Sequence, residues 1–200
     1  MHLIILFALL QGFTEFIPVS SQGHLILFNN FFNINIMSHI TVLEANVIAH
    51  AGSLIAVSLY YRREVFSLLI SLRHIVRPDI DKNSTLLIQL IVATLPILLC
   101  GFFFSKYFNY DDKSLFLIIG ITSISFGIVL FFFDRFCLTV KGSQEMNFLT
   151  SLFVGIFQCL ALIPGVSRSG SIIIFLRFCG YNRNFAVFFS NLLSIPVIFA

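Results

Sequence analysis

The sequence predicts an all-α, polytopic membrane protein that forms a single transmembrane domain over residues 1–200. The first observation is composition: 58% of the residues are hydrophobic, 10% are charged, and the mean hydropathy is +0.98. Soluble domains carry about 25% charged residues, because their surfaces must be hydrated. The second is the length of the charge-free segments, since roughly 20 apolar residues cross the hydrocarbon core as a helix. The third is a pair of apolar segments that proline, glycine and serine interrupt.

Three long apolar segments predict simple crossings, at about residues 45–61, 85–104 and 114–133. The loop at 62–82 between the first two holds five basic residues, whereas the loop at 105–113 has two lysines against two aspartates. Basic residues in short loops stay in the cytoplasm, so the first loop is expected inside and the second outside.

The two interrupted segments, residues 11–28 and 157–175, are not expected to be simple crossings. Proline removes a backbone donor and disfavours helix in the residue before it, so each segment should break near its proline. Aligned on their prolines, with Gly165 as one insertion, the segments share these pairs: Pro18 and Pro164, Val19 and Val166, Ser20 and Ser167, Gly23 and Gly170, Phe28 and Phe175.

This similarity predicts an internal repeat, with repeat 1 at about 1–104 and an incomplete repeat 2 at about 114–200. Three crossings separate the two units, so the second should be inverted relative to the first. Broken helices in corresponding positions of inverted repeats are typical of a binding site near the middle of the bilayer. We therefore expect two re-entrant hairpins that meet there.

The first interrupted segment carries an acidic and a hydroxyl-rich element. Gln11 and Glu15 lie four residues apart and share a helix face, where their oxygens suit a hard cation such as Mg²⁺ or simply join two helices. Ser20, Ser21 and His24 follow the proline. A serine and a histidine there could act as nucleophile and base, or as phosphate-binding hydroxyls beside a proton donor.

The second segment, Gly165-Val-Ser-Arg-Ser-Gly170, suits an anion. Small residues let backbone N–H groups approach an anion, and a helix that begins at about Gly170 directs its positive end toward it. Arg168 adds a planar fork for two phosphate oxygens. The alternative is an arginine that extends to the membrane interface; its flanking glycines and serines disfavour that.

Other polar residues are left outside the predicted site. Glu44 and His50 lie at the outer end of a crossing, and Asn191 and Ser194 are expected to hydrogen-bond neighbouring helices. The four scattered cysteines predict neither a zinc site nor a disulfide framework. The net charge of +3 sits in loops and indicates topology rather than nucleic-acid binding.

These motifs resemble a known family. QGFTEFIPVSSQGH and GIFQCLALIPGVSRSG are similar to the two signatures of the bacterial undecaprenyl-diphosphate phosphatases, also called bacitracin-resistance proteins. EANVIAHAGSLIAVSLYYRRE and SNLLSIPVIFA resemble the same family, so the similarity covers essentially the whole chain.

The resemblance implies a hydrolase of the bacterial inner membrane that converts undecaprenyl diphosphate to the monophosphate. This reaction recycles the lipid carrier of peptidoglycan synthesis and gives bacitracin resistance. The family has inverted helical repeats with re-entrant segments, depends on Mg²⁺ or Ca²⁺, sits among membrane lipids and often forms homodimers. Carried over to this sequence, the resemblance implies catalytic roles for Glu15, Ser20, His24 and Arg168, metal binding by Gln11 and Glu15, and phosphate binding by Ser21, Gly165, Ser167, Ser169, Gly170 and Ser171.

Two departures from the family pattern stand out. Ile172 takes the place of a threonine that the family usually has, and Ser171 is the nearest hydroxyl. Family members continue for several more membrane segments, so the sequence is expected to be a fragment or a truncated, even inactive, phosphatase.

A type 2 phosphatidic-acid phosphatase is rejected, because that family needs a histidine after its Ser-Arg motif and no histidine follows His74. An intramembrane serine protease is a weaker alternative still, because its serine and histidine would more often lie on separate helices. A small transporter or channel with a midplane anion site is the alternative from another class.

Overall fold

The computed structural model describes residues 2–32, 41–74, 81–104, 112–141 and 146–199. Nearly all of this part of the chain is helical, apart from short connections and one isolated bridge between Lys141 and Tyr181. The helices are α1 (His2–Thr14), α2 (Ser21–Phe32), α4 (Val42–Tyr60), α5 (Arg62–Ser71), α6 (Lys82–Phe104), α7 (Asp112–Phe136), α8 (Phe148–Gln158), α9 (Arg168–Phe178) and α10 (Arg183–Phe199), with 3₁₀ turns at Leu72–His74 and Cys159–Leu162. The predicted all-α class is confirmed.

Three helices are long and apolar enough to cross a membrane, and they match the three predicted crossings. The spans are Leu43–Tyr60 in α4, Lys82–Phe103 in α6 and Ser114–Phe136 in α7. Helix α4 begins with a capping box, in which Thr41 accepts from the backbone N–H of Glu44 and the Glu44 carboxylate accepts from the N–H of Thr41. Glu44 is therefore a helix-capping residue at the end of a crossing.

The predicted loop at 62–82 begins with a helix instead. Helix α5 follows α4 after a single non-helical residue, Tyr61, and buries Leu68 against the core. Ser71 at its end donates to the Asp81 carboxylate at 2.6 Å, and this bond is the main cause of the lowered pKa of Asp81. The loop prediction was wrong because the residues that follow Arg62 and Arg63 are mostly apolar and give the segment one face that can pack.

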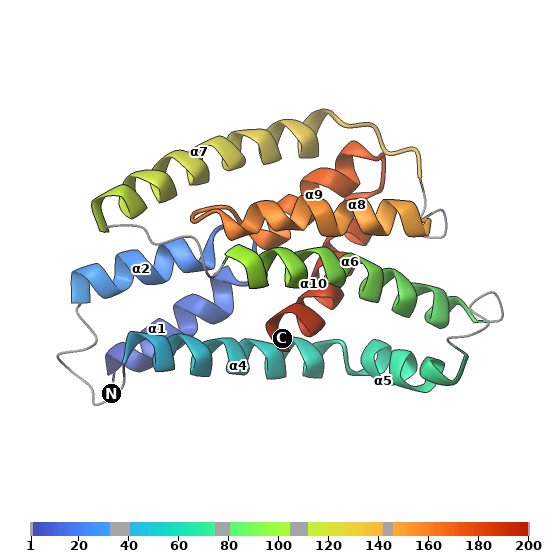
Figure 1. Cartoon of the computed structure of the whole chain (residues 1–200), viewed down its shortest axis with the longest axis horizontal. Coiled ribbons are helices and arrows are strands. Elements are labelled where there is room, and N and C mark those ends of the chain that lie inside the picture. The colour runs from blue at the N-terminus through green and yellow to red at the C-terminus, as the bar shows by residue number, and fades with distance from the viewer. Residues whose placement is uncertain (1, 33–40, 75–80, 105–111, 142–145, 200) are drawn as a thin grey trace.

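Two hairpins form where the sequence predicts breaks. In Figure 1, α1 and α2 run from one end of the molecule to its middle and back, while α8 and α9 enter from the opposite end. The breaks between the helices contain Pro18 and Pro164, as predicted. That both hairpins re-enter a bilayer from opposite sides stays a prediction.

Most of the described core belongs to the second half of the chain. Helices α6, α8, α9 and α10 share one large buried cluster, to which α5 adds Leu68. Its fully buried members include Val154, Ile172, Leu176, Phe189 and Leu193. Helices α1, α2 and α4 share a smaller cluster built around Phe7, Leu25 and Phe28, with Ala45 and Ala49. The two hairpins are therefore anchored very differently.

Helix α7 holds the tip of the second hairpin, which is the break between α8 and α9 around Pro164. Thr122 donates its hydroxyl to the Pro164 carbonyl at 2.7 Å, and Ser123 donates to the Gly165 carbonyl at 3.1 Å. Gly165 has φ +90°, and a Cβ on it would lie 2.1 Å from Thr122 Oγ1. Only glycine suits this position, because both the backbone conformation and the lack of space exclude a side chain.

Candidate active site

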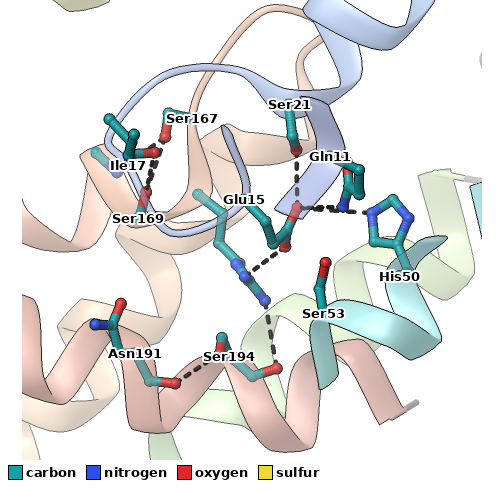
Figure 2. A network of polar contacts seen from close by, with 12 residues as sticks. Gln11, Glu15, Ile17, Ser21, His50, Ser53, Ser167, Ser169, Asn191 and Ser194 are labelled. Carbon is teal, nitrogen blue, oxygen red and sulfur yellow. Dashed lines mark hydrogen bonds and ion pairs between the residues drawn. The ribbon is translucent and has the colours of Figure 1, made fainter. Parts of the chain in front are cut away.

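Glu15 is the centre of a polar cluster in the break between α1 and α2. Its side chain is 7% exposed. Figure 2 shows Gln11 and Ser21 on one side of the carboxylate: Gln11 Nε2 donates to Oε2 at 2.9 Å and Ser21 Oγ donates to the same oxygen at 2.8 Å. The prediction that Gln11 and Glu15 share a helix face is confirmed. Ser20, the neighbouring serine, points its oxygen elsewhere.

Arg168, the first residue of α9, supplies the charge that balances Glu15. Its Nη2 donates to Glu15 Oε1 at 2.7 Å, and its side chain is 14% exposed. Its Nη1 lies 3.5 Å from the Ser194 carbonyl, which is a weak contact. One side of the guanidinium therefore holds the carboxylate, while Nη1 keeps hydrogen-bonding capacity for a ligand. Removing either partner of such a pair would leave the other charge without compensation.

The helices that follow the two breaks begin with the same cap. Ser20 Oγ accepts from the N–H of Gly23 at 3.1 Å, and Ser167 Oγ accepts from the N–H of Gly170 at 3.1 Å. These are the pairs that the alignment of the two segments predicts. Helix α9 therefore begins at Arg168 rather than at the predicted Gly170. Both α2 and α9 direct their N-terminal, electropositive ends toward the junction.

Two of the predicted phosphate-binding serines join structural elements instead of facing the cluster. Ser169 Oγ donates to the Ile17 carbonyl at 3.1 Å and lies 3.1 Å from Ser167 Oγ, so it ties the two tips together (Figure 2). Ser171 is fully buried and donates to the Ser167 carbonyl at 2.9 Å. A Cβ on Gly170 would lie 3.1 Å from Ser167 Cβ, so the absence of a side chain there avoids a tight contact with the capping serine.

A cavity of about 870 Å³ opens beside the Glu15–Arg168 pair. Five predicted site residues line it: Glu15, Ser20, Ser21, Ser167 and Arg168. Helix α4 contributes its polar residues Asn46 and His50, and apolar residues from α4, α6 and the end of α10 complete the wall. The cavity thus offers one arginine, two helix N-termini and several hydroxyls to an anion.

Comparison with known proteins places this chain in a family. The family model of the bacitracin resistance protein BacA matches residues 4–200. An undecaprenyl-diphosphatase of Aliivibrio salmonicida is 40% identical over 192 residues, which cover 96% of this chain and 70% of that relative. Undecaprenyl-diphosphatases of Jannaschia sp. and Pelagibacter ubique are each 38% identical, over 98% of this chain and 73% and 70% of their own lengths.

The chain belongs to the BacA family.

In this BacA-family chain, His24 lies apart from the Glu15 cavity. It lines a separate space of about 150 Å³ between the two tips and α7, which Ser20, Ser123 and Gly165 also line. Its Nδ1 lies 2.6 Å from the Ser20 carbonyl oxygen, not from the Ser20 hydroxyl. The hydroxyl is committed to the helix cap. A proton-transfer role for His24 stays a prediction.

Sequence reasoning left Asn46 and His50 out of the site, yet the cavity of this chain includes both. Their i, i+4 spacing on a crossing matches that of Gln11 and Glu15, and that repeated polar pair is the signal that could have revealed them. Figure 2 shows the His50 ring directed at the Glu15 carboxylate, with Nε2 3.7 Å from Oε2.

The oxygen atoms around Glu15 are compatible with a divalent cation. Gln11 Oε1 and Asn46 Oδ1 are buried and accept no hydrogen bond within the described part of the chain. No group of three His, Cys, Asp or Glu side chains gathers among those residues. Mg²⁺ is typically held by one or two carboxylates with waters and substrate phosphates, so one carboxylate and amide oxygens suffice only if the ligand adds the rest.

Proposed function

We propose that this chain hydrolyses undecaprenyl diphosphate to undecaprenyl phosphate and inorganic phosphate. The BacA family and the undecaprenyl-diphosphatase names of its relatives support this reaction. The activity recycles the lipid carrier of peptidoglycan synthesis at the bacterial inner membrane and gives bacitracin resistance.

The polar cavity beside Glu15 adjoins an apolar groove, and this observation carries the proposal. The cavity beside Glu15 and Arg168 shares Leu54 and Phe199 with a groove of about 520 Å³ between α4, α5, α6 and α10. Leucine and isoleucine side chains dominate the groove lining. A prenyl diphosphate has this same division, with a charged head and an apolar tail, so its head suits the cavity and its first isoprene units suit the groove.

Catalysis in this site depends on positioning and on compensating charge. Phosphoryl transfer proceeds through a loose transition state whose negative charge spreads over the phosphoryl oxygens. Arg168 and the N-termini of α2 and α9 supply the opposite charge where that negative charge develops. Glu15 orients Arg168 and the Ser21 hydroxyl by accepting from both. The attacking oxygen comes from a water in the cavity or from Ser21.

A Mg²⁺ or Ca²⁺ ion is the expected cofactor, with Glu15 and Gln11 as the residues that would hold it. When bound, such an ion compensates the negative charge of the diphosphate. The re-entrant arrangement and a homodimer are further expectations of the same proposal, and they follow from the family resemblance.

Phosphate release tests the proposed reaction. The purified chain is assayed in detergent with C15 and C55 prenyl diphosphates and Mg²⁺, beside Glu15→Gln and Arg168→Lys. We expect release by the wild type and a fall of about 100-fold or more in each variant, because Glu15→Gln weakens the contact that orients Arg168 and Arg168→Lys replaces the planar guanidinium with a point charge. Arg73→Lys, at an exposed arginine, is the matched control and should keep wild-type activity. A folded wild type that transports but never hydrolyses the diphosphate would contradict the proposal.

Ser21→Ala separates the two sources of the attacking oxygen. If Ser21 is the nucleophile, phosphate release is abolished, because the other two serine hydroxyls of the cavity lining, Ser20 and Ser167, cap helices. If water attacks directly, the variant keeps a measurable rate and loses only the orienting contact. Ser171→Ala is the comparison, since that hydroxyl is buried away from the cavity.

A further inference from the structure

The Glu15 cavity has no excess of negative charge. Among the described residues that line it, Glu15 is the single acid and Arg168 is the single residue with a permanent positive charge. Arg168 Nη2 lies 2.7 Å from Glu15 Oε1, so the two charges compensate each other. The His50 imidazole also lines the cavity, and it adds no negative charge in either protonation state. A divalent cation that arrives alone would therefore meet a lining with no net negative charge.

Hydrogen bonds already occupy most of the Glu15 carboxylate. Oε2 accepts from Gln11 Nε2 at 2.9 Å and from Ser21 Oγ at 2.8 Å, while Oε1 accepts from Arg168 Nη2 at 2.7 Å. An ionised carboxylate offers about four acceptor positions. About one position is therefore left for a cation, so Glu15 alone is a weak site that needs further oxygen ligands.

Two amide oxygens near this carboxylate accept from no donor within the described part of the chain. They are Gln11 Oε1 and Asn46 Oδ1, and both atoms are buried. A buried acceptor without a protein donor is typically completed by a bound water, an ion or another ligand. Asn46 also lines the cavity, so its oxygen is placed to contact what the cavity binds.

The two helices bring these amides to one level. Glu15 Oε2 lies 3.7 Å from His50 Nε2, and this contact joins the C-terminal end of α1 to α4. Gln11 and Asn46 each come four residues earlier, and α1 and α4 run in the same direction (Figure 1). Four residues make about one helical turn, so both amides lie one turn before the Glu15–His50 contact. The interface between α1 and α4 therefore gathers one carboxylate and two amide oxygens.

We infer that Asn46 Oδ1 is an oxygen ligand of the divalent cation and that this cation binds tightly only together with the diphosphate, an inference that rests on the proposed function. Carboxylate and amide oxygens suit hard cations such as Mg²⁺ and Mn²⁺. Glu15 and Asn46 supply the protein oxygens, and the diphosphate supplies further oxygens and the missing negative charge. Binding of the two ligands is then coupled, and each raises the affinity for the other by the same factor.

Binding of Mn²⁺ measures this coupling without turnover. The purified full chain in detergent is titrated with Mn²⁺, and free Mn²⁺ is followed by EPR with and without a non-hydrolysable C15 prenyl methylenediphosphonate. The same titration without protein corrects for the Mn²⁺ that the diphosphonate binds in solution. We expect the wild type to bind Mn²⁺ about 10- to 100-fold more tightly when the analogue is present. Equal affinities with and without the analogue would overturn the inference.

Asn46→Asp converts the amide into a second carboxylate of nearly the same shape. Without the analogue, this variant should bind Mn²⁺ about 10-fold or more tightly than the wild type, because the cavity then has the missing negative charge. Gln22→Glu is the matched control, since it adds a carboxylate at an exposed position of the same cavity. Its Mn²⁺ affinity should stay within about threefold of the wild type, because solvent screens an exposed charge. Equal gains in the two variants would overturn the assignment of Asn46 as a ligand.

Asn46→Leu removes the oxygen and keeps a side chain of similar volume. With the analogue present, its Mn²⁺ affinity should fall by about 10-fold or more, because one ligand is lost. Ser53→Ala on the same helix is the control, since that hydroxyl donates to the Ala49 carbonyl of its own helix. Melting temperatures in detergent show which variants are folded. An unchanged Mn²⁺ affinity in a folded Asn46→Leu would mean that the oxygen contacts no cation and would overturn the assignment.

Phosphate release on the same preparations separates this inference from the proposed function. A wild type that hydrolyses C15 prenyl diphosphate, while its Mn²⁺ affinity ignores the analogue, overturns the coupling and leaves the proposed function standing. A wild type that binds no analogue and releases no phosphate overturns both. Hydrolysis together with coupled Mn²⁺ binding, and with the expected order of the Asn46 variants, supports both.

Discussion

The two hairpins share a sequence pattern but differ in how deeply they are buried and in what they pack against. Eight of the eleven residues of α9 are buried, whereas only Gly23, Leu25 and Phe28 are buried among the twelve residues of α2. The second hairpin lies in the large core and is clamped by α7, while the first rests on a small apolar cluster. Yet both begin their returning helix with a serine cap of the same geometry.

The contrast between the hairpins shows that the two copies of a repeated motif can supply different parts of one site. The common cap directs two helix N-termini at one place, which suits an anion whichever hairpin is considered. The charges are not shared: the first hairpin supplies the carboxylate of Glu15 and the second supplies the guanidinium of Arg168. The buried hairpin therefore fixes the cationic group in place, and the peripheral one carries the group that orients it.

Gly165 gives the largest expected effect and tests whether the second tip is the rigid one. Gly165→Ala should lower the free energy of unfolding by about 2–5 kcal/mol, from an unfavourable φ together with the clash against Thr122. Gly12→Ala is the control in the first hairpin: a Cβ there meets nothing within 4 Å, and the change should stabilise α1 by up to about 1 kcal/mol. Reversible unfolding in detergent measures both, and equal effects would erase the contrast between the hairpins.

The ion pair tests whether the two hairpins act as one unit. Glu15→Gln and Arg168→Lys should each lower kcat/KM for a prenyl diphosphate by about 100- to 1000-fold. The double variant should be about as active as the worse single variant, because each change already disrupts the shared contact. Phosphate-release kinetics on the four proteins give the coupling. Losses that multiply would show that the two charges work independently.

The serine caps sharpen the comparison on a smaller scale. Ser20 and Ser167 are each 7% exposed and make caps of equal length, but Ser167 also contacts Ser169 Oγ at 3.1 Å. Ser20→Ala should cost about 1 kcal/mol of stability, and Ser167→Ala about 1–2 kcal/mol, within the range known for caps. Thermal unfolding of the two variants in the same detergent measures the difference, and a greater loss in Ser20→Ala would reverse the expected order.

The smallest expected effect concerns the clamp from α7. Ser123→Ala removes one hydroxyl bond to the Gly165 carbonyl and should cost about 0.5–1 kcal/mol. Ser125→Ala on the same helix is the matched control, since that exposed hydroxyl only returns to its own helix at Ile121. Unfolding curves that coincide for the two variants would show that this bond adds nothing to the second hairpin.

The parts of the fold that follow from local chemistry were predictable. Apolar length predicted the three crossings, proline predicted the two breaks, and the alignment paired the serines and glycines that the structure shows in two equivalent caps. The Gln11–Glu15 pair followed from helical spacing alone. Helix α5 was missed because its arginines suggested a loop, although its apolar face packs on the core.

The parts that depend on long-range contact were not predictable. Sequence spacing does not reveal that Arg168 pairs with Glu15, that Ser169 ties the tips together, or that Thr122 and Ser123 hold the second tip. His50 was set aside because a polar residue at the outer end of a crossing could equally lie at the membrane interface. Only the packing of α4 against the first hairpin brings that ring to the cavity.

The Glu15–Arg168 pair also sets a problem of timing during synthesis. Its partners are 153 residues apart in the chain, so the ribosome makes the carboxylate long before the guanidinium. At about 5–20 residues per second, the interval is roughly 8–30 s. Until Arg168 arrives, an inserted first hairpin would hold an uncompensated charge or a protonated acid within the membrane. The first hairpin should therefore insert into the membrane only after Arg168 has been made, or its carboxylate should stay in contact with water at the translocon until then.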